Sequence, residues 1–275
     1  MIPAPGYGDR ERRAARLQAG RPHSSELLGF YRKVLGLQEK VYREATVAPW
    51  GESSAGLRDL PWEILAESLR SFAGELAPLA PEPTRVAGER LVAGASESLR
   101  GLLSGLAEHE SIAEPAAALG VEEAHAGLYA RAFLQPWAEA ARRRGDSGAG
   151  DLTPESSLCP ACSWPAQVSV LQDEGEIRGQ RSLVCALCGS GWSSRRQRCA
   201  HCGEENPERL ALHEAEGLAH VQVESCASCR RYLKRVDLRR FGKAVPVVED
   251  LATPELDLWA RERELEKICP NLLGI

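Results

Sequence analysis

Eight of the nine cysteines in this sequence stand in four Cys-x-x-Cys pairs, all of them between residues 159 and 229. The pairs are Cys159 with Cys162, Cys185 with Cys188, Cys199 with Cys202, and Cys226 with Cys229. Two residues between cysteines allow one tight turn to direct both sulfur atoms at the same ion. Two such pairs supply four thiolates, which form a closed tetrahedral site suited to zinc or to iron. The pattern therefore predicts metal binding.

The four pairs form an internal repeat. The first two pairs are separated by 22 residues and the last two by 23. A strand-like segment between the pairs of each half is the layout of a zinc ribbon or rubredoxin-like module. We predict sequential pairing, with Cys159, Cys162, Cys185 and Cys188 on one ion and Cys199, Cys202, Cys226 and Cys229 on the other. An interleaved cross-brace is the alternative pairing, and disulfides or redox-active Cys-x-x-Cys couples are the alternatives to metal.

Residues beside the pairs are weaker candidates. A glycine after the second cysteine favours the turn because it accepts a positive φ without steric cost. Gly189 and Gly203 fit that rule, whereas Ser163 and Arg230 do not. Four further side chains could in principle act as ligands, but we expect the histidines to lie on the surface and the cysteine to be partly buried: His201, His213, His220 and Cys269.

Composition narrows the class of protein. The 275 residues include 43% hydrophobic and 27% charged residues, which is typical of a globular chain. A formal net charge of −5 and a pI near 5.8 argue against bulk electrostatic binding to nucleic acid or anionic membranes. No apolar run is long enough to span a membrane, and the N-terminal arginines are not followed by the apolar region of an export signal. We therefore expect a cytoplasmic protein.

The chain changes character near residue 145. Apolar residues at helical spacing predict helices before that point, interrupted by proline and glycine. Alternating segments such as 167–171 and 219–223 predict short strands after it. The predicted fold class is α+β, a helical N-terminal domain followed by two tandem rubredoxin-like or zinc-ribbon modules. The predicted boundaries are a flexible N-terminus over 1–25, a helical domain over 26–145, a linker over 146–157, the first metal module over 158–192, the second over 193–245, and a C-terminal helical segment and tail over 246–275.

A basic run follows the last cysteine pair, and it includes Arg231, Lys234, Arg235 and Arg239. Residues 151–243 nevertheless hold 13 lysines and arginines against 12 acidic residues, so this region is nearly neutral. A solvated strand or an acidic protein partner explains the basic run as well as nucleic-acid binding does. We therefore expect that the protein has no nucleic-acid partner.

The same residues resemble the formate dehydrogenase accessory protein family (FdhE). The resemblance covers residues 158–275, and it is loose over the helical part. The matching segments are Cys159-Pro160-Ala161-Cys162, Leu183-Val184-Cys185-Ala186-Leu187-Cys188 with Trp192, Arg195 to Cys199-Ala200-His201-Cys202-Gly203, Glu224-Ser225-Cys226-Ala227-Ser228-Cys229-Arg230-Arg231-Tyr232-Leu233-Lys234, Asp250-Leu251-Ala252-Thr253 with Leu256-Asp257, and Pro270-Asn271-Leu272-Leu273-Gly274. Ser163 is a departure, because glycine is expected there.

The resemblance implies a cytoplasmic factor that supports the assembly of formate dehydrogenase by contacting its catalytic subunit. It also implies iron as the metal, one ion for each four-cysteine site, whereas thiolate count alone leaves zinc as the alternative. Air is expected to promote metal loss or covalent dimers.

Two other classes of function remain open, a thiol- or iron-redox enzyme acting on the client and a zinc-ribbon nucleic-acid-binding protein. Closed four-thiolate sites leave no position for substrate, and no catalytic triad, phosphate loop or dinucleotide signature is present. An assembly factor that is not an enzyme, with no membrane insertion, is therefore the prediction.

Overall fold

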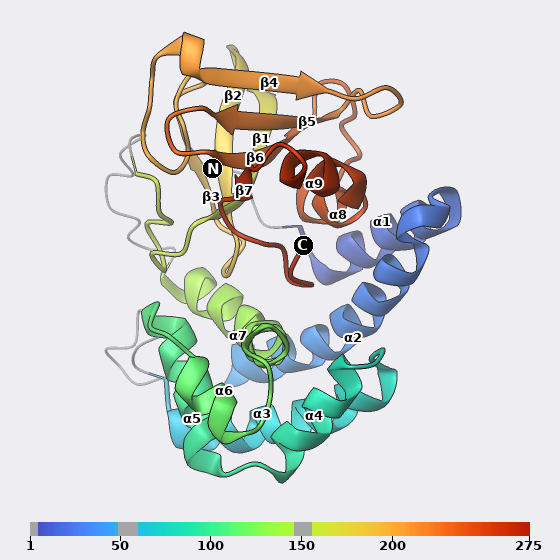
Figure 1. Cartoon of the computed structure of the whole chain (residues 1–275), viewed down its shortest axis with the longest axis vertical. Helices are drawn as coiled ribbons and strands as arrows, with labels where there is room; N and C mark the ends of the chain where they lie inside the picture. Colours follow the sequence, from blue (N-terminus) through green and yellow to red (C-terminus); the bar gives the residue numbers. More distant parts are fainter. Residues whose placement is uncertain (1–4, 49–59, 146–155) are drawn as a thin grey trace. The chain divides into compact units, whose positions relative to one another are not determined.

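The structure, a computed structural model, describes residues 5–48, 60–145 and 156–275. These residues divide into two compact units. The sheet unit contains residues 5–29 together with residues 156–273, and the helical unit contains residues 30–145 (Figure 1). The predicted α+β fold class is confirmed, whereas the predicted linker lies almost entirely outside the described residues. No helix within the described ranges is both long and apolar enough to cross a membrane.

The helical unit is built from amphipathic helices around an aliphatic core. Phe72 and Phe133 meet edge to face, with ring centroids 5.7 Å apart. The hydroxyl of Tyr129 donates a hydrogen bond to the carbonyl of Thr84, at 3.1 Å. A β-carbon on Gly88 would lie 2.2 Å from that hydroxyl, so only glycine allows this approach. The helices are α2 (Ser25–Val47, which begins in the sheet unit), α3 (Trp62–Leu76), α4 (Thr84–Ala93), α5 (Ser96–Glu108), α6 (Ala113–Ala118) and α7 (Glu123–Gly145), with a short 3-10 turn η3 at Ala77–Leu79.

Residues 84–106 form two helices and not one continuous helix. The chain leaves the helix at Gly94, where the backbone becomes extended, and α5 starts at Ser96. A β-carbon on Gly94 would lie 2.0 Å from the side chain of Leu119. Close packing at this glycine therefore accompanies the break.

The sheet unit contains one mixed sheet with the strand order β3-β2-β1-β6-β5-β4, and β7 pairs with β6 (Figure 1). The first cysteine region contributes β1 (Ala166–Glu174), β2 (Ile177–Cys185) and β3 (Gly191–Ser193). The second contributes β4 (Leu210–Glu214), β5 (Val221–Cys226) and β6 (Arg231–Asp237), with η4 (Pro207–Arg209) before β4 and β7 (Glu266–Lys267) near the end. The two predicted modules are therefore halves of one sheet.

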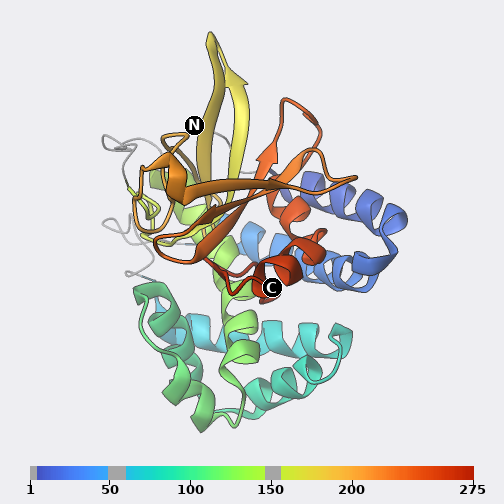
Figure 2. The same ribbon diagram turned by 45° about the horizontal axis from the view of Figure 1, so that its top comes forward.

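Strands β1 and β6 form the junction between the two halves. They run parallel, with Val168 opposite Lys234 and Leu171 opposite Asp237. Strand β7 also pairs in parallel with β6, whereas β1–β2, β2–β3, β4–β5 and β5–β6 are antiparallel. Figure 2 shows the β1–β2 hairpin standing out from the sheet. Because the junction joins residues far apart in the sequence, local strand patterns cannot predict it.

Helices α8 (Pro246–Leu251) and α9 (Pro254–Arg261) cover one face of this sheet (Figure 1). Leu256 and Ala260 of α9 pack with Val221, Val223 and Tyr232 of the sheet. Alternate residues of β5 and β6 therefore point to the helices, and the intervening residues point to the opposite face.

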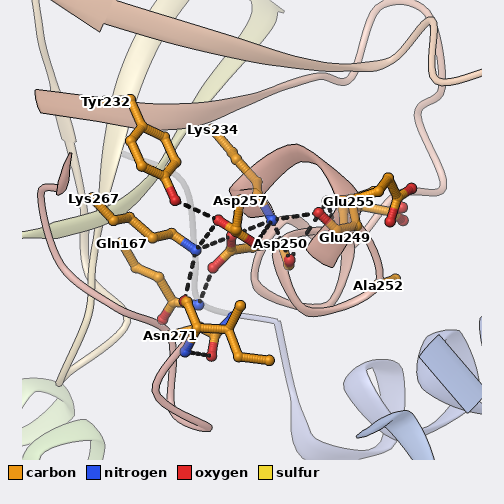
Figure 3. A network of polar contacts seen from close by, with 12 residues as sticks. Gln167, Tyr232, Lys234, Glu249, Asp250, Ala252, Glu255, Asp257, Lys267 and Asn271 are labelled. Atoms are coloured by element: carbon orange, nitrogen blue, oxygen red, sulfur yellow. Dashed lines mark hydrogen bonds and ion pairs between the residues drawn. The ribbon is translucent and has the colours of Figure 1, made fainter. Parts of the chain in front are cut away.

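A buried polar network joins this helical cover to the sheet (Figure 3). The ammonium group of Lys234 donates to Asp257 Oδ2 at 2.6 Å and to the carbonyl of Asp250 at 2.7 Å. Lys267 donates to Asp250 Oδ1 at 2.7 Å, and the hydroxyl of Tyr232 donates to Asp257 Oδ1 at 2.8 Å. Two cations thus face two carboxylates. Burial by itself raises the pKa of Asp250, but the two lysines outweigh it and hold that pKa below its usual value.

The segment predicted to be a flexible N-terminus contains helix α1 (Tyr7–Gly20) followed by the 3-10 turn η1 (Pro22–Ser24), and this part of the prediction is wrong. Helix α1 lies against α8 in the sheet unit. Arg13 forms an ion pair of 2.5 Å with Glu249, whose side chain is fully buried, and stacks on the ring of Phe241. One of the N-terminal arginines is thus the partner of a buried carboxylate. His220 Nε2 lies 3.1 Å from the second oxygen of Glu249.

Candidate metal centres

Each cysteine pair lies on a tight turn with the same backbone conformation. The residue after the second cysteine has a positive φ in all four turns: 60° at Ser163, 67° at Gly189, 76° at Gly203 and 58° at Arg230. Its amide donates to the carbonyl of the first cysteine at 2.7 Å for Ser163 and 2.9 Å for Arg230. The two positions that depart from the glycine rule therefore adopt the glycine-like conformation, at a cost of about 1 kcal/mol each.

The turns bring the sulfur atoms together in two groups. Cluster 1 is Cys159, Cys162, Cys185 and Cys188, and cluster 2 is Cys199, Cys202, Cys226 and Cys229. In each cluster all four sulfur atoms lie within 4.8 Å of one another. The structure thus groups the cysteines as in the sequential pairing and not as in the cross-brace.

The sulfur separations fit a tetrahedral ion. In cluster 1 they are 3.6 Å for Cys159 and Cys188 and 3.4 Å for Cys162 and Cys185. In cluster 2 they are 3.7 Å for Cys199 and Cys229 and for Cys202 and Cys226. A tetrahedral ion with metal–sulfur bonds of about 2.3 Å requires sulfur atoms about 3.8 Å apart, whereas a disulfide requires about 2.05 Å. No disulfide joins any of the nine cysteines, all of which lie in the described ranges, and the sulfur spacing of each cluster is one that could hold a metal ion.

Hydrogen bonds to sulfur support the same assignment. The amides of Leu187 and Cys188 donate to Cys185 Sγ, at 3.3 and 3.4 Å. The amide of His201 donates to Cys199 Sγ at 3.4 Å. In contrast, the thiol of Cys188 itself donates to the hydroxyl of Ser190 at 3.1 Å, a contact that sequence reasoning missed. Donors directed at sulfur stabilise the charged thiolate, which is the form that a metal binds.

The two clusters differ in their contact with solvent. In cluster 1, three cysteines are buried and Cys162 is half-buried. In cluster 2, Cys199 and Cys226 are buried, Cys229 is half-buried and Cys202 is exposed. Water and small reagents therefore reach a sulfur atom of cluster 2 more readily.

The other candidate residues lie outside both clusters, since each four-residue group found among the described residues consists of cysteines alone. His201 is exposed, as expected for a side chain that points away from its turn. Partial desolvation of its imidazole ring and the charge of the nearby Arg231 hold the pKa of His201 below the usual value. His213 Nε2 lies 2.8 Å from the hydroxyl of Ser225, and its ring packs on Trp259. Cys269 is 5% exposed, which fits a buried apolar role.

The basic run does not form a continuous solvated face. Lys234 is completely buried in the polar network described above, and Arg235 pairs with the carboxylate of Glu224. Arg239 donates to both carboxylate oxygens of Asp237, at 2.9 and 2.7 Å. Alternation along β6 explains the split, because Lys234 points to the helices and Arg235 to the opposite face.

The fold and these sites define a class of protein with two four-cysteine groups on one mixed sheet, accompanied by a helical unit. Two family models match consecutive parts of the chain: the FdhE central domain over residues 158–196 and the FdhE C-terminal domain over residues 197–273. The first match contains all four cysteines of cluster 1, and the second contains all four cysteines of cluster 2. The resemblance to the FdhE family is thus confirmed over residues 158–273.

Individual relatives agree with this assignment. The chain is similar to the "Protein FdhE homolog" of Aquifex aeolicus, with 35% identity over 43% of this chain and 42% of that protein. It is similar to the homolog of Shewanella oneidensis, with 28% identity over 82% of this chain and 74% of that protein. The crystal structure of the FdhE protein from Pseudomonas aeruginosa has the same fold, with a TM-score of 0.72 and 24% identity over 99% of this chain and 98% of that one. The chain spans about two fifths of the length of the first of these relatives.

Proposed function

We propose that this protein is an accessory factor for the assembly of formate dehydrogenase, which acts in the cytoplasm by binding the catalytic subunit of that enzyme. The observation that carries the proposal is the unbroken FdhE match over residues 158–273, which contains all eight paired cysteines. The family name supplies the client, and the closed geometry of the clusters supports a role other than substrate turnover.

Each cluster is proposed to hold one metal ion through its four sulfur atoms. Iron is preferred because the family resemblance implies it, and zinc is the alternative. Iron in such a site supplies reversible one-electron chemistry, whereas zinc supplies only structure. In either case the chain's own residues fill all four tetrahedral positions, so no position remains for a substrate. We therefore assign to the metal a role in stabilising the fold of the sheet unit. If the metal is iron, we also assign to it a response to oxidants.

A covalent dimer formed in air is also proposed, and the structure points to Cys202 as the residue that would form it. Cys202 is the exposed member of cluster 2, whereas Cys269 is buried. After metal loss, a thiolate at the surface can reach a second chain without local unfolding. Non-reducing gels of the air-exposed protein should show a dimer that disappears in the Cys202→Ser variant and persists in the matched Cys269→Ser control.

The test of the proposal uses the full chain, purified without oxygen and immobilised, together with the catalytic subunit of formate dehydrogenase from the same organism. We expect two metal ions per chain and retention of the subunit. An unrelated subunit of similar size and charge is the control. Two bound ions without retention of the catalytic subunit would leave the metal assignment standing and would refute the assembly role.

A further inference from the structure

A pocket lies on the sheet face opposite helices α8 and α9. Its volume is about 210 Å³. The segment 196–200, which leads into cluster 2, forms one side of it. Strands β4, β5 and β6 form its floor, through Leu212, Glu224 and Leu233. The pocket therefore combines residues from both sides of the third cysteine pair.

The charges around this pocket are unbalanced. Glu224 is shared by two arginines, Arg181 at 2.6 Å and Arg235. Glu205 is likewise shared by Arg195 at 3.0 Å and Arg198 at 2.6 Å. Each carboxylate thus faces two guanidinium groups, and the pocket lining holds an excess of positive charge, with four arginines and one glutamate.

Arg196 adds to this excess. It lines the pocket, is exposed, and forms no ion pair within the part of the chain that the structure describes. A β-carbon on Gly179 would lie 2.7 Å from Nη2 of Arg196 and 2.9 Å from Nη1 of Arg239, so two guanidinium groups approach the same glycine. Arg239 is paired with Asp237, whereas Arg196 has no carboxylate partner among the described residues and so favours an anion from outside the chain.

The floor of the pocket has a different character. Leu233 is buried, while Leu212 on β4 is 45% exposed. Leu210 and Ile268 also line the pocket. Aliphatic side chains next to unpaired positive charge suit a ligand with an apolar group beside a carboxylate, and they suit a free inorganic anion poorly, since such an ion cannot use the apolar floor.

We infer that this pocket binds a peptide segment of the partner protein in which an aspartate or glutamate stands beside a large apolar residue. The inference rests on the proposed function, since the partner is the catalytic subunit. The carboxylate contacts Arg196 at the rim, and the apolar side chain covers Leu212 and Leu233. An Asp or Glu carboxylate matches the planar donors of arginine and forms two parallel hydrogen bonds with them.

The test compares two double variants of the full chain in the retention assay. The first is Arg196→Glu with Leu212→Asp, which reverses the rim charge and removes the apolar floor. The second, a matched control, is Arg178→Glu with Ile177→Asp on the β1–β2 hairpin, where Arg178 and Ile177 are also exposed. Both change the net charge equally. Metal content and thermal unfolding verify that both variants fold.

We expect the first variant to lose at least about tenfold in retained subunit and the control to match the wild type. An array of overlapping short peptides that tile the catalytic subunit should show binding to acidic-apolar segments, with loss of those spots for the first variant. Unchanged retention of the catalytic subunit by the first variant would refute the binding role of the pocket and leave the proposed function standing. A wild-type chain that retains no subunit overturns the proposed function and the pocket together. Binding of single-stranded DNA that the first variant loses would also overturn the inference, by assigning the pocket to phosphate.

Discussion

Clusters 1 and 2 have nearly the same cysteine spacing and a similar turn conformation but different surroundings. The difference is clearest in the last turn of each. Leu187 lies between Cys185 and Cys188 and is 1% exposed. The equivalent residue between Cys226 and Cys229 is Ser228, which is exposed and donates to Glu204. Cysteine spacing therefore determines which sulfur atoms meet, and the residues between the cysteines determine how deeply the site is buried.

Because the two clusters differ in burial, they should differ in metal exchange and in the reactivity of their sulfur atoms. A buried cluster exchanges its ion only when the surrounding structure opens, so it is suited to a permanent structural role. An exposed sulfur atom, such as that of Cys202, is available to chelators, oxidants and other proteins without such an opening. The shared sheet complicates this contrast, because β1 and β6 connect the two sites directly. The predictions below test how independent the clusters are.

The largest effect is expected from loss of a buried ligand. Cys185→Ser should remove one metal ion and lower the free energy of unfolding by several kcal/mol, since metal binding in small metal-folded peptides is worth on the order of 10 kcal/mol. Cys202→Ser should also remove about one ion but cost less stability, because water can take the vacant position at an exposed ligand. Metal analysis and denaturant unfolding of both variants measure the difference. Equal losses of stability would remove the contrast between the clusters, and two ions retained in either variant would contradict the sequential pairing.

The next effect concerns the junction between the two halves of the sheet. Lys234 on β6 is paired in register with Val168 on β1, and its ammonium group neutralises Asp250 and Asp257. Lys234→Met keeps most of the side-chain volume but leaves one lysine for two buried carboxylates, which should cost about 3–5 kcal/mol. We expect both clusters to release metal together when this variant is heated. Release from one cluster at a lower temperature than the other would show that the halves unfold separately. Arg178→Met, at an exposed ion pair, is the control and should change stability by less than about 1 kcal/mol.

A smaller effect, on rates, should distinguish the clusters in the unmodified protein. During partial treatment with a chelator and a thiol-alkylating reagent, the cysteines of cluster 2 should be modified about tenfold faster than those of cluster 1, because Cys202 is exposed. Mass spectrometry of peptides containing Cys202 and Cys188 measures the ratio. Equal modification at every time point would mean that the two sites open in a single step through their common sheet.

The smallest effect concerns the turn residues. Ser163 is exposed and has a φ of 60°, so Ser163→Gly should raise the free energy of unfolding by up to about 1 kcal/mol. Gly203 has a φ of 76°, and a β-carbon there would lie 2.8 Å from Nη2 of Arg198, so Gly203→Ala should lower stability by about 1 kcal/mol or more. Opposite signs in thermal unfolding would show that both clusters use the same turn. A destabilising Ser163→Gly would mean that the serine side chain contributes more than the strain costs.

Much of the candidate site can be predicted from sequence because its determinants are local. A Cys-x-x-Cys turn is four residues long, and the two near-equal spacings leave few ways to group the pairs. The strand over 167–171 is equally local, since the alternation of apolar and polar residues marks it as a strand. The alternation does not show that both sides of this segment are buried. Helices α2 and α3 follow the same logic, because apolar residues recur along both at helical spacing. Domain limits could not be derived this way, because α1 joins the sheet unit through contacts with α8, more than two hundred residues away in the sequence.

The sequence by itself therefore determined the division into helical and strand-rich parts, the grouping of the sulfur atoms and the resemblance to FdhE. Only the tertiary structure decided that both cysteine regions share one sheet, that Lys234 is buried while Arg235 faces the pocket, and that Cys202 is exposed. The physical reason is the range of the interactions. Turns and alternation depend on residues a few positions apart, whereas solvent access and ion pairing depend on which distant strands and helices pack together. The parallel pairing of β1 with β6 determines the surroundings of Lys234 and of the junction between the clusters, and no short segment of the chain encodes that pairing.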